Sequence, residues 1–336
     1  MSGLEPGQRA GLLSAKLGAL VRSGWGERAA ERDDFPGGAA QVDGTTGWVL
    51  LDSTPLAALG PALVWADRRG LVDVHLLTEV DAGVLARRAD LFTNAPTVWV
   101  IDGTEVRLAE PAPSLPPVLP TPAPVLAGLL VDAGLEIVVE DGVVRGEVLG
   151  LEVARIVHGT TTAGTPIDEP VLEVGVGHAD RELTGMLHGN LPPAEQLTRV
   201  VEIVTQQRRP TAERHPLNQL APERWLRARL AAEPARVGLS ELHAAPPAVP
   251  RPNLRDPAIA VAIGRGHDGD EVVVACSVGI HLDLVPAAAD ARQALAPAAR
   301  LLLVMPERDA HPVTRALADR LVRPAEVIAL EGDWRT

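Results

Sequence analysis

The sequence predicts an α/β protein with mixed sheets, built from repeated αβ units in two or three modules. Short apolar runs of strand length alternate with stretches whose apolar residues recur at helical spacing. Two proline-rich stretches interrupt this pattern. The length of 336 residues also exceeds the roughly 250–300 residues at which a single hydrophobic core usually stops growing.

The proline-rich stretches predict the module boundaries. The first runs from Pro111 to Pro124 and the second from Pro246 to Pro252. Such runs favour extended spacers, because proline lacks a backbone donor and restricts φ. The predicted organisation is an N-terminal αβ module over residues 1–110, a proline-rich linker over 111–123, a middle α+β module ending in helices over 124–245, and a C-terminal αβ module over 246–336.

The N-terminal module shows the αβ pattern in its second half. Residues 47–53 (GWVLLDS) read as a buried strand, and residues 59–66 place apolar side chains on one helix face. Strands at 72–77 and 97–102 flank a second helix, for which Asp81 is the predicted N-cap. Strands joined by helices of this length imply parallel pairing.

The middle module is predicted to begin with a helix near residues 125–133. A hairpin turn is expected at Glu140-Asp141-Gly142. The strands around it are predicted at residues 135–139, 143–157 and 171–177. The helices that end the module are predicted at residues 179–187, 194–207 and 222–232.

The C-terminal module repeats the order of the first. Its strands are predicted at residues 271–276, 301–305 and 326–330. One helix covers 286–298, and another opens at His311-Pro312 with proline in the favoured first position. The similarity of LLTEVDAGVLARRADLFTNAPTVWVIDG to LLVMPERDAHPVTRALADRLVRPAEVIALEG predicts an internal duplication. Two unrelated αβ units are the alternative, because short patterns recur by chance.

The composition predicts an acidic cytoplasmic protein. A net charge of −13 opposes general binding to nucleic acid and anionic membranes. The single cysteine, Cys276, excludes an intrachain disulfide and a multi-cysteine zinc site. The sequence has neither a signal-peptide pattern nor an apolar stretch of about 18 residues, so we expect no membrane partner.

Strong catalytic motifs are missing from the sequence. Lys16 is the only lysine, and no glycine-rich phosphate loop surrounds it. The sequence contains no G-x-S-x-G elbow and no H-E-x-x-H pair. Cys276 lies in the apolar run VVVACSV, which is typical of an inert buried cysteine. These observations favour a non-enzymatic role without an evident cofactor.

One pair of acidic residues could nevertheless support chemistry. Glu152 lies in GLEVARIV and Glu173 in VLEVGVG, on predicted neighbouring strands. Two such carboxylates can bind Mg²⁺ or Mn²⁺, which prefer oxygen ligands. They are therefore the candidate catalytic and metal-binding residues. The alternative is that both are solvent-facing positions in a strand alternation.

The predicted order of a helix, a meander carrying acids, and another helix resembles the core of restriction-endonuclease-like nucleases. In that family an acid on one strand and a Glu-x-Lys on the next bind metal and activate water. Glu173-Val174-Gly175 has glycine at the lysine position, and the equivalent strands at 51–53 and 275–277 also lack lysine. The resemblance therefore implies a degenerate nuclease-like fold. Stretches such as HPLNQLAPERWLRARL and VPRPNLRDP are also similar to conserved uncharacterised proteins of GC-rich bacteria, a resemblance that implies no activity.

A basic region departs from the acidic background. Residues 199–229 contain seven arginines and three glutamates, a local balance of +4. An aromatic residue among arginines favours binding of phosphate, nucleic acid or an acidic partner. The alternative is a solvated helix face whose arginines pair with acids elsewhere. The candidate binding residues are Arg208, Arg209, Arg214, Arg224, Trp225 and Arg227.

The leading functional prediction is a non-catalytic scaffold or partner-binding protein. Its expected partner is another protein, and assembly into a homo-oligomer is a further expectation. The first alternative is a Mg²⁺- or Mn²⁺-dependent phosphodiester hydrolase, in which Glu152 and Glu173 bind the metal and the arginines hold phosphate. The second is nucleic-acid binding through residues 199–229 without cleavage.

Overall fold

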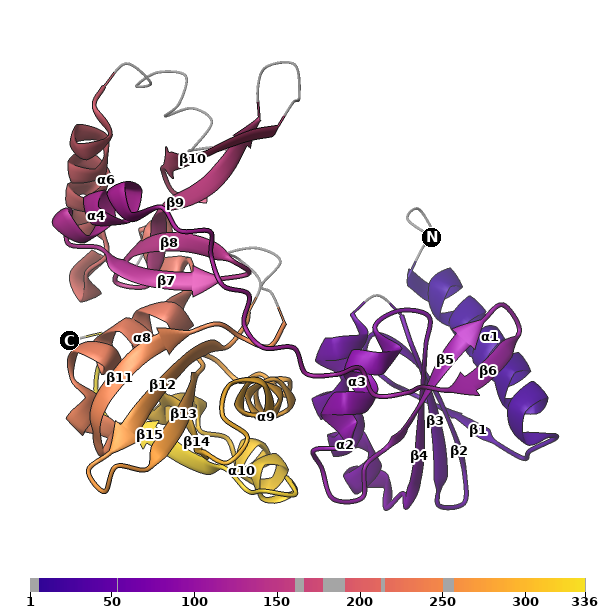
Figure 1. Ribbon diagram of the computed structural model, residues 1–336. Helices are drawn as coiled ribbons and strands as arrows, with labels where there is room; N and C mark the ends of the chain where they lie inside the picture. The colour runs from indigo at the N-terminus through magenta and orange to yellow at the C-terminus, as the bar shows by residue number, and fades with distance from the viewer. Residues whose placement is uncertain are drawn as a thin grey trace. The chain divides into compact units, whose positions relative to one another are not determined.

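The computed structural model contains three β-sheets and their helices (Figure 1). It describes residues 6–335, except residue 53 and residues 161–165, 178–190, 213–214 and 250–256. The predicted α/β class is confirmed, because 38% of the structure is helix and 30% is strand, and the sheets of six, four and five strands are mixed or antiparallel. The chain divides into two compact units: unit 1 holds residues 1–114, 281–290 and 311–326, and unit 2 holds residues 115–280, 291–310 and 327–336.

The first sheet lies in unit 1, and its strands follow one another in chain order. β3, β4 and β5 are parallel, and the other pairs are antiparallel. The strands expected at 47–53, 72–77 and 97–102 are confirmed, whereas β1, β2 and β6 were not predicted. The strands are β1 (Glu31–Asp33), β2 (Gly38–Asp43), β3 (Thr46–Leu51), β4 (Asp73–Thr78), β5 (Thr97–Asp102) and β6 (Glu105–Leu108).

Helices cover both faces of the first sheet (Figure 1). α1 (Pro6–Trp25) packs on β2, β3 and β6, and α2 (Leu59–Arg69) and α3 (Ala82–Ala89) lie on the other face. A 3₁₀ turn, η1 (Pro55–Ala58), leads into α2, and Gly70 caps the end of α2 with a φ of 64° that suits glycine. Asp81 occupies the N-cap position of α3, as predicted, but its side chain makes no capping hydrogen bond.

The second sheet lies in unit 2 and is an antiparallel meander. The predicted single strand at 143–157 is wrong, because the chain reverses at Leu149 and Gly150, which have φ values of 47° and 73°. Asp141 and Gly142 form the expected hairpin turn, also with positive φ. The strands are β7 (Glu136–Glu140), β8 (Val143–Val148), β9 (Leu151–Thr160) and β10 (Pro166–Val174).

Helices follow and precede the second sheet in the chain. The helices expected near 125–133, 194–207 and 222–232 are confirmed, and the one expected at 179–187 lies outside the described residues. No described helix is both long and apolar enough to cross a membrane. The helical elements are α4 (Pro124–Asp132), α6 (Pro193–Gln207), η2 (Pro210–Ala212), α7 (Pro216–Gln219), α8 (Pro222–Ala232) and η3 (Pro234–Val237).

The third sheet also lies in unit 2. Its first two strand pairs are antiparallel and β13 pairs with β14 in parallel, while α8 packs on β11, β12 and β13. β11 precedes residue 246, so this sheet starts before the predicted C-terminal module. The elements are β11 (Leu239–Ala245), β12 (Ala260–Gly266), β13 (Glu271–Cys276), α9 (Leu284–Leu295), β14 (Arg300–Pro306), η4 (Glu307–Asp309), α10 (Pro312–Asp319) and β15 (Glu326–Leu330).

Candidate functional site

The second sheet has one apolar face and one charged face. Its apolar face packs against α4 and α6, where Leu130, Leu197 and Val204 are fully buried. Directly paired residues of antiparallel strands point to the same side of a sheet. The pairings Glu136–Glu147, Arg145–Arg155, Glu147–Glu152 and Arg155–Glu173 therefore define the opposite face. We call it the charged face, and its members are Glu136, Glu140, Arg145, Glu147, Glu152, Arg155 and Glu173.

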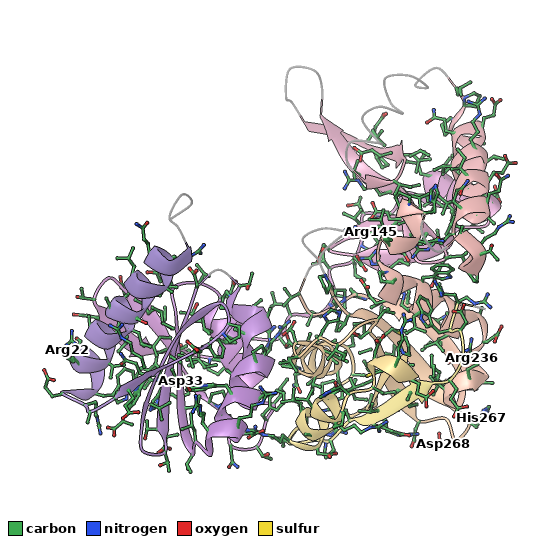
Figure 2. The ribbon with its side chains drawn as sticks, turned by 180° about the vertical axis from the view of Figure 1, so that it is seen from behind. Arg22, Asp33, Arg145, Arg236, His267 and Asp268 are labelled. Atoms are coloured by element: carbon green, nitrogen blue, oxygen red, sulfur yellow. The ribbon has the colours of Figure 1, made fainter. Side chains whose placement is uncertain are left out.

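A β-bulge turns Glu152 toward the charged face. The strand register shifts by one residue between the pairs Gly146–Ala154 and Glu147–Glu152. In an unbroken ladder the side chain of Glu152 would point to the apolar face, because strand side chains alternate. The shift instead lets Arg145 Nη1 donate to Glu152 Oε2 over 2.6 Å. Arg145 is labelled in Figure 2.

α8 supplies two arginines to the charged face. Arg224 Nη1 lies 2.7 Å from Glu147 Oε1, and Arg227 Nη2 lies 2.5 Å from Glu147 Oε2. Arg224 also donates to Glu140 Oε2 over 2.6 Å. Residues three apart project from the same face of a helix, which is why both arginines reach one carboxylate. The side chain of Glu147 is fully buried between them.

The arginines keep the buried carboxylate ionised. Burial alone would raise the pKa of Glu147, but the charges of Arg227 and Arg224 outweigh burial and hold that pKa below its ordinary value. Burial would lower the pKa of Arg224, and the carboxylates of Glu147 and Glu140 raise it above its ordinary value instead. Burial raises the pKa of Glu136, and the negative charge of Glu147 adds to that rise. Glu147 and Arg224 therefore both carry their charges at neutral pH.

Glu152 and Glu173 lie on neighbouring strands, as predicted, and on the same face. Arg155 Nε donates to Glu173 Oε2 over 2.7 Å, while Glu152 binds Arg145. Each carboxylate therefore has its own arginine. Glu152 is buried, so the alternative that both acids face solvent is wrong for this residue. Within the described parts of the chain, no group of three or more His, Cys, Asp or Glu is placed to hold a metal ion.

Most of the predicted basic patch is buried. The exposed fraction is 1% for Arg208, Trp225 and Arg227, and 3% for Arg224. The prediction of an exposed binding surface over these four residues is corrected, because carboxylates from β7 and β8 match the charges of Arg224 and Arg227. Arg209 is exposed and donates to the carbonyl of Thr205. Arg214 lies outside the described residues.

Arg208 binds carbonyl groups instead of phosphate. Its guanidinium donates to the carbonyls of Leu149, Leu217, Leu220 and Ala221 at distances of 2.6–3.1 Å. It also lies 4.9 Å from the ring centre of Trp225, a cation–π distance. One side chain therefore ties the β8–β9 turn to α7 and to the start of α8. Burial lowers the pKa of Arg208 to about 10.

Sequence reasoning missed Glu140, Arg145 and Glu147, although β8 carried a usable signal. Arg145 and Glu147 alternate with apolar neighbours in VVRGEV, which indicates a charged strand face. Arg224 and Arg227 of α8 are spaced three apart. Matching a charged strand face to arginines on one helix face would have predicted an internal network instead of a surface.

Unit 1 contains a second buried ion cluster. Asp290 has an exposed fraction of 0% and accepts from Arg87 Nε over 2.8 Å and from Arg88 Nε over 3.0 Å. Burial raises the pKa of the nearby Asp283 to about 6, even though Arg88 lies 3.4 Å away. Cys276 in unit 2 is buried, as expected of an inert cysteine, and burial raises its pKa to about 12.

Two pockets are lined by residues that do not belong to the charged face. One of about 370 Å³ in unit 1 is lined by α2 and the start of β4, with Asp67 and Arg320 at its edge. The other, of about 300 Å³ in unit 2, is lined by residues that follow β14 and β15, including Trp334. Arg320 Nη1 lies 2.6 Å from Asp67 Oδ1, so the two charges at the edge of the first pocket neutralise each other.

Millimolar Mn²⁺ should leave the melting temperature unchanged in a thermal-shift measurement. A cation at the charged face would have to displace Arg145 from Glu152 and Arg155 from Glu173. A ligand present at about 100 times its Kd would add roughly 2.7 kcal/mol to the free energy of unfolding. A shift that occurs in the wild type and disappears in Glu173→Ala would contradict this expectation and restore the metal-site prediction.

Comparison with known proteins gives no relative: no family model, no curated protein and no solved structure matches the chain. The fold and site define an α/β protein with three described sheets, in which arginines of the same chain bind four carboxylates of the charged face. The nuclease-like resemblance stays a prediction.

Proposed function

We propose that this chain is a non-catalytic partner-binding protein whose contact surface is centred on residues 115–131. Among the described residues, fourteen large hydrophobic side chains are exposed, and five of them fall in this short range. They are Leu115, Val118, Leu119, Val125 and Val131. Residues 111–131 also contain no charged side chain. A concentration of exposed apolar side chains in one short segment is typical of a protein interaction site.

α4 carries the second half of this surface. Asp132 is the only charged residue of α4, so this helix is apolar on nearly all sides. A helix of that kind is normally buried. Leu130 is indeed buried against the second sheet, but Val125 is 79% exposed and Val131 is 61% exposed. Binding of a partner would remove these two exposed side chains from water, which is favourable.

The charged face supports a role without catalysis. Four of its carboxylates, including the candidate metal ligands Glu152 and Glu173, are bound to arginines of the same chain, which opposes their use in activating water. The hydrolase and nucleic-acid-binding alternatives both need arginines that contact phosphate. Arg208, Arg224 and Arg227 are buried, so these three cannot serve that purpose. A phosphate group cannot reach a guanidinium that lies inside the protein.

We also propose that the first and third sheets belong to two copies of one module. The order α1–β1–β2–β3–α2–β4–α3–β5 corresponds to α8–β11–β12–β13–α9–β14–α10–β15. The first two strand pairs are antiparallel and the third is parallel in both sheets. In an alignment of homologous sequences, residues 6–102 and 222–330 should match along their whole length. Similarity restricted to one strand would argue against duplication.

Co-purification from the protein's own host tests the proposed function. A protein that accompanies the tagged wild-type chain should be recovered at least about tenfold less with Val125→Ser/Val131→Ser, a loss of about 1.4 kcal/mol of binding free energy. Val72→Ser/Val322→Ser is the matched control, because these valines are 72% and 61% exposed but lie in unit 1. Equal recovery with all three proteins would contradict the proposal.

A further inference from the structure

An extended proline segment forms the first half of the proposed contact surface. Four of the nine residues 115–123 are proline, and none of the nine belongs to a helix or a strand. Proline holds φ near the value of the polyproline II helix, a conformation without internal hydrogen bonds. We infer that residues 115–123 are a polyproline II ligand for a partner domain with an aromatic-lined groove. This inference rests on the proposed function and names the class of partner.

The segment rests on the body of unit 2 before any partner binds. A Cβ atom built on Gly142 would lie 2.9 Å from Val118 Cγ1 and 3.6 Å from the carbonyl oxygen of Leu119. The segment therefore packs on the β7–β8 turn, and Pro124 then starts α4. Ordering a peptide in advance lowers the conformational entropy that binding removes.

The spacing of the prolines fits this type of recognition. A polyproline II helix has three residues per turn, so Pro116, Leu119 and Pro122 share one edge. All three side chains are exposed, Leu119 to 85%. Pro117 and Pro120 have the P-x-x-P spacing that aromatic grooves of SH3 and WW domains accept. The edge of proline rings and leucine is therefore available for a groove.

The partner groove should be apolar as well as aromatic. The segment has no charged residue, and the nearest ones in sequence are Glu110 and Asp132. An acidic pocket beside the groove would therefore meet no cation on this chain. Proline rings and Leu119 would instead fill spaces between aromatic side chains, and the carbonyl groups would accept hydrogen bonds from the groove.

Calorimetric titration of the full-length chain with a purified SH3 domain and a purified WW domain tests the inference. At least one domain should bind, and Pro117→Ala/Pro120→Ala should weaken that binding at least about tenfold. Pro36→Ala/Pro297→Ala is the matched control, because both prolines are exposed and lie outside the segment. Absence of binding to both domains, or equal binding by the two double variants, would overturn the inference.

The host co-purification separates the two proposals. If Val125→Ser/Val131→Ser loses the partner and Pro117→Ala/Pro120→Ala keeps it, the chain binds a partner through α4 and the polyproline inference fails. Loss of the partner with both double variants supports the inference as well as the proposed function. Retention by both variants refutes the proposed function itself.

Discussion

Glu147→Ala should lower the free energy of unfolding by about 3–5 kcal/mol, the usual cost of removing one partner from a buried ion pair. Arg224 and Arg227 would remain in the interior, 3% and 1% exposed, with their main carboxylate gone. Domain stabilities are commonly about 5–15 kcal/mol, so this loss would be a large fraction of the total. Urea unfolding followed by circular dichroism measures the change as a lower transition midpoint at constant slope.

Two further variants show whether charge is the cause. Glu173→Ala removes an acid of the same sheet whose side chain is 36% exposed, and it should cost less than about 1 kcal/mol. Glu147→Leu combined with Arg224→Met and Arg227→Met should recover part of the stability, because it leaves neither arginine unpaired in the interior, while Glu140 loses Arg224 and keeps Arg145 at 3.8 Å. Equal midpoints for Glu147→Ala and Glu173→Ala would contradict the assigned role of the network.

The same network predicts how stability depends on pH. Glu147 has a pKa lowered in the folded protein from its ordinary value of 4.5. Its stabilising contribution is therefore complete above the unfolded-state pKa and is lost as the pH falls through the lower folded-state pKa. The triple variant lacks this carboxylate, so its stability should fall less than that of the wild type between pH 5 and more acidic values.

The elements that could be predicted from the sequence are those with a local signal. β5 and α10 were expected at their observed positions because each combines apolar periodicity with a clear boundary residue. β1 has only three residues, two of them exposed, and no apolar alternation marks it. Its pairing with β2 depends on the rest of the sheet, which single-sequence patterns do not contain.

The candidate site could be predicted only in part, because its partners are distant in the chain. The Arg224–Glu147 contact joins residues 77 positions apart. A local charge count therefore found a balance of +4 around the arginines without the acids that neutralise it. The bulge on β9 adds a second obstacle, because it reverses which side of the strand Glu152 faces and leaves no mark in the alternation.

Arg208→Lys should be the most damaging conservative substitution in unit 2. A lysine ammonium is a point charge with three donors, whereas the planar guanidinium of Arg208 reaches four carbonyls in different directions. Each buried carbonyl left without a donor costs about 1–3 kcal/mol. The Ala221 carbonyl also accepts from the amides of Arg224 and Trp225, so a lysine that reaches one of the other three carbonyls leaves two without a donor, a loss of about 2–6 kcal/mol. The contact with the Trp225 ring is weakened as well.

Arg209→Lys is the matched control, because the neighbouring side chain is exposed and donates to one carbonyl only. It should change the free energy of unfolding by less than about 0.5 kcal/mol, as surface substitutions usually do. Comparing the two variants tests whether Arg208 holds the β8–β9 turn against the start of α8. A Cβ on Gly150 in that turn would lie 2.2 Å from the carbonyl oxygen of Arg224, so the turn and α8 are in direct contact. If Arg208→Lys unfolds no earlier than Arg209→Lys, the turn must be held by other contacts, and the ion network around Glu147 does not depend on Arg208.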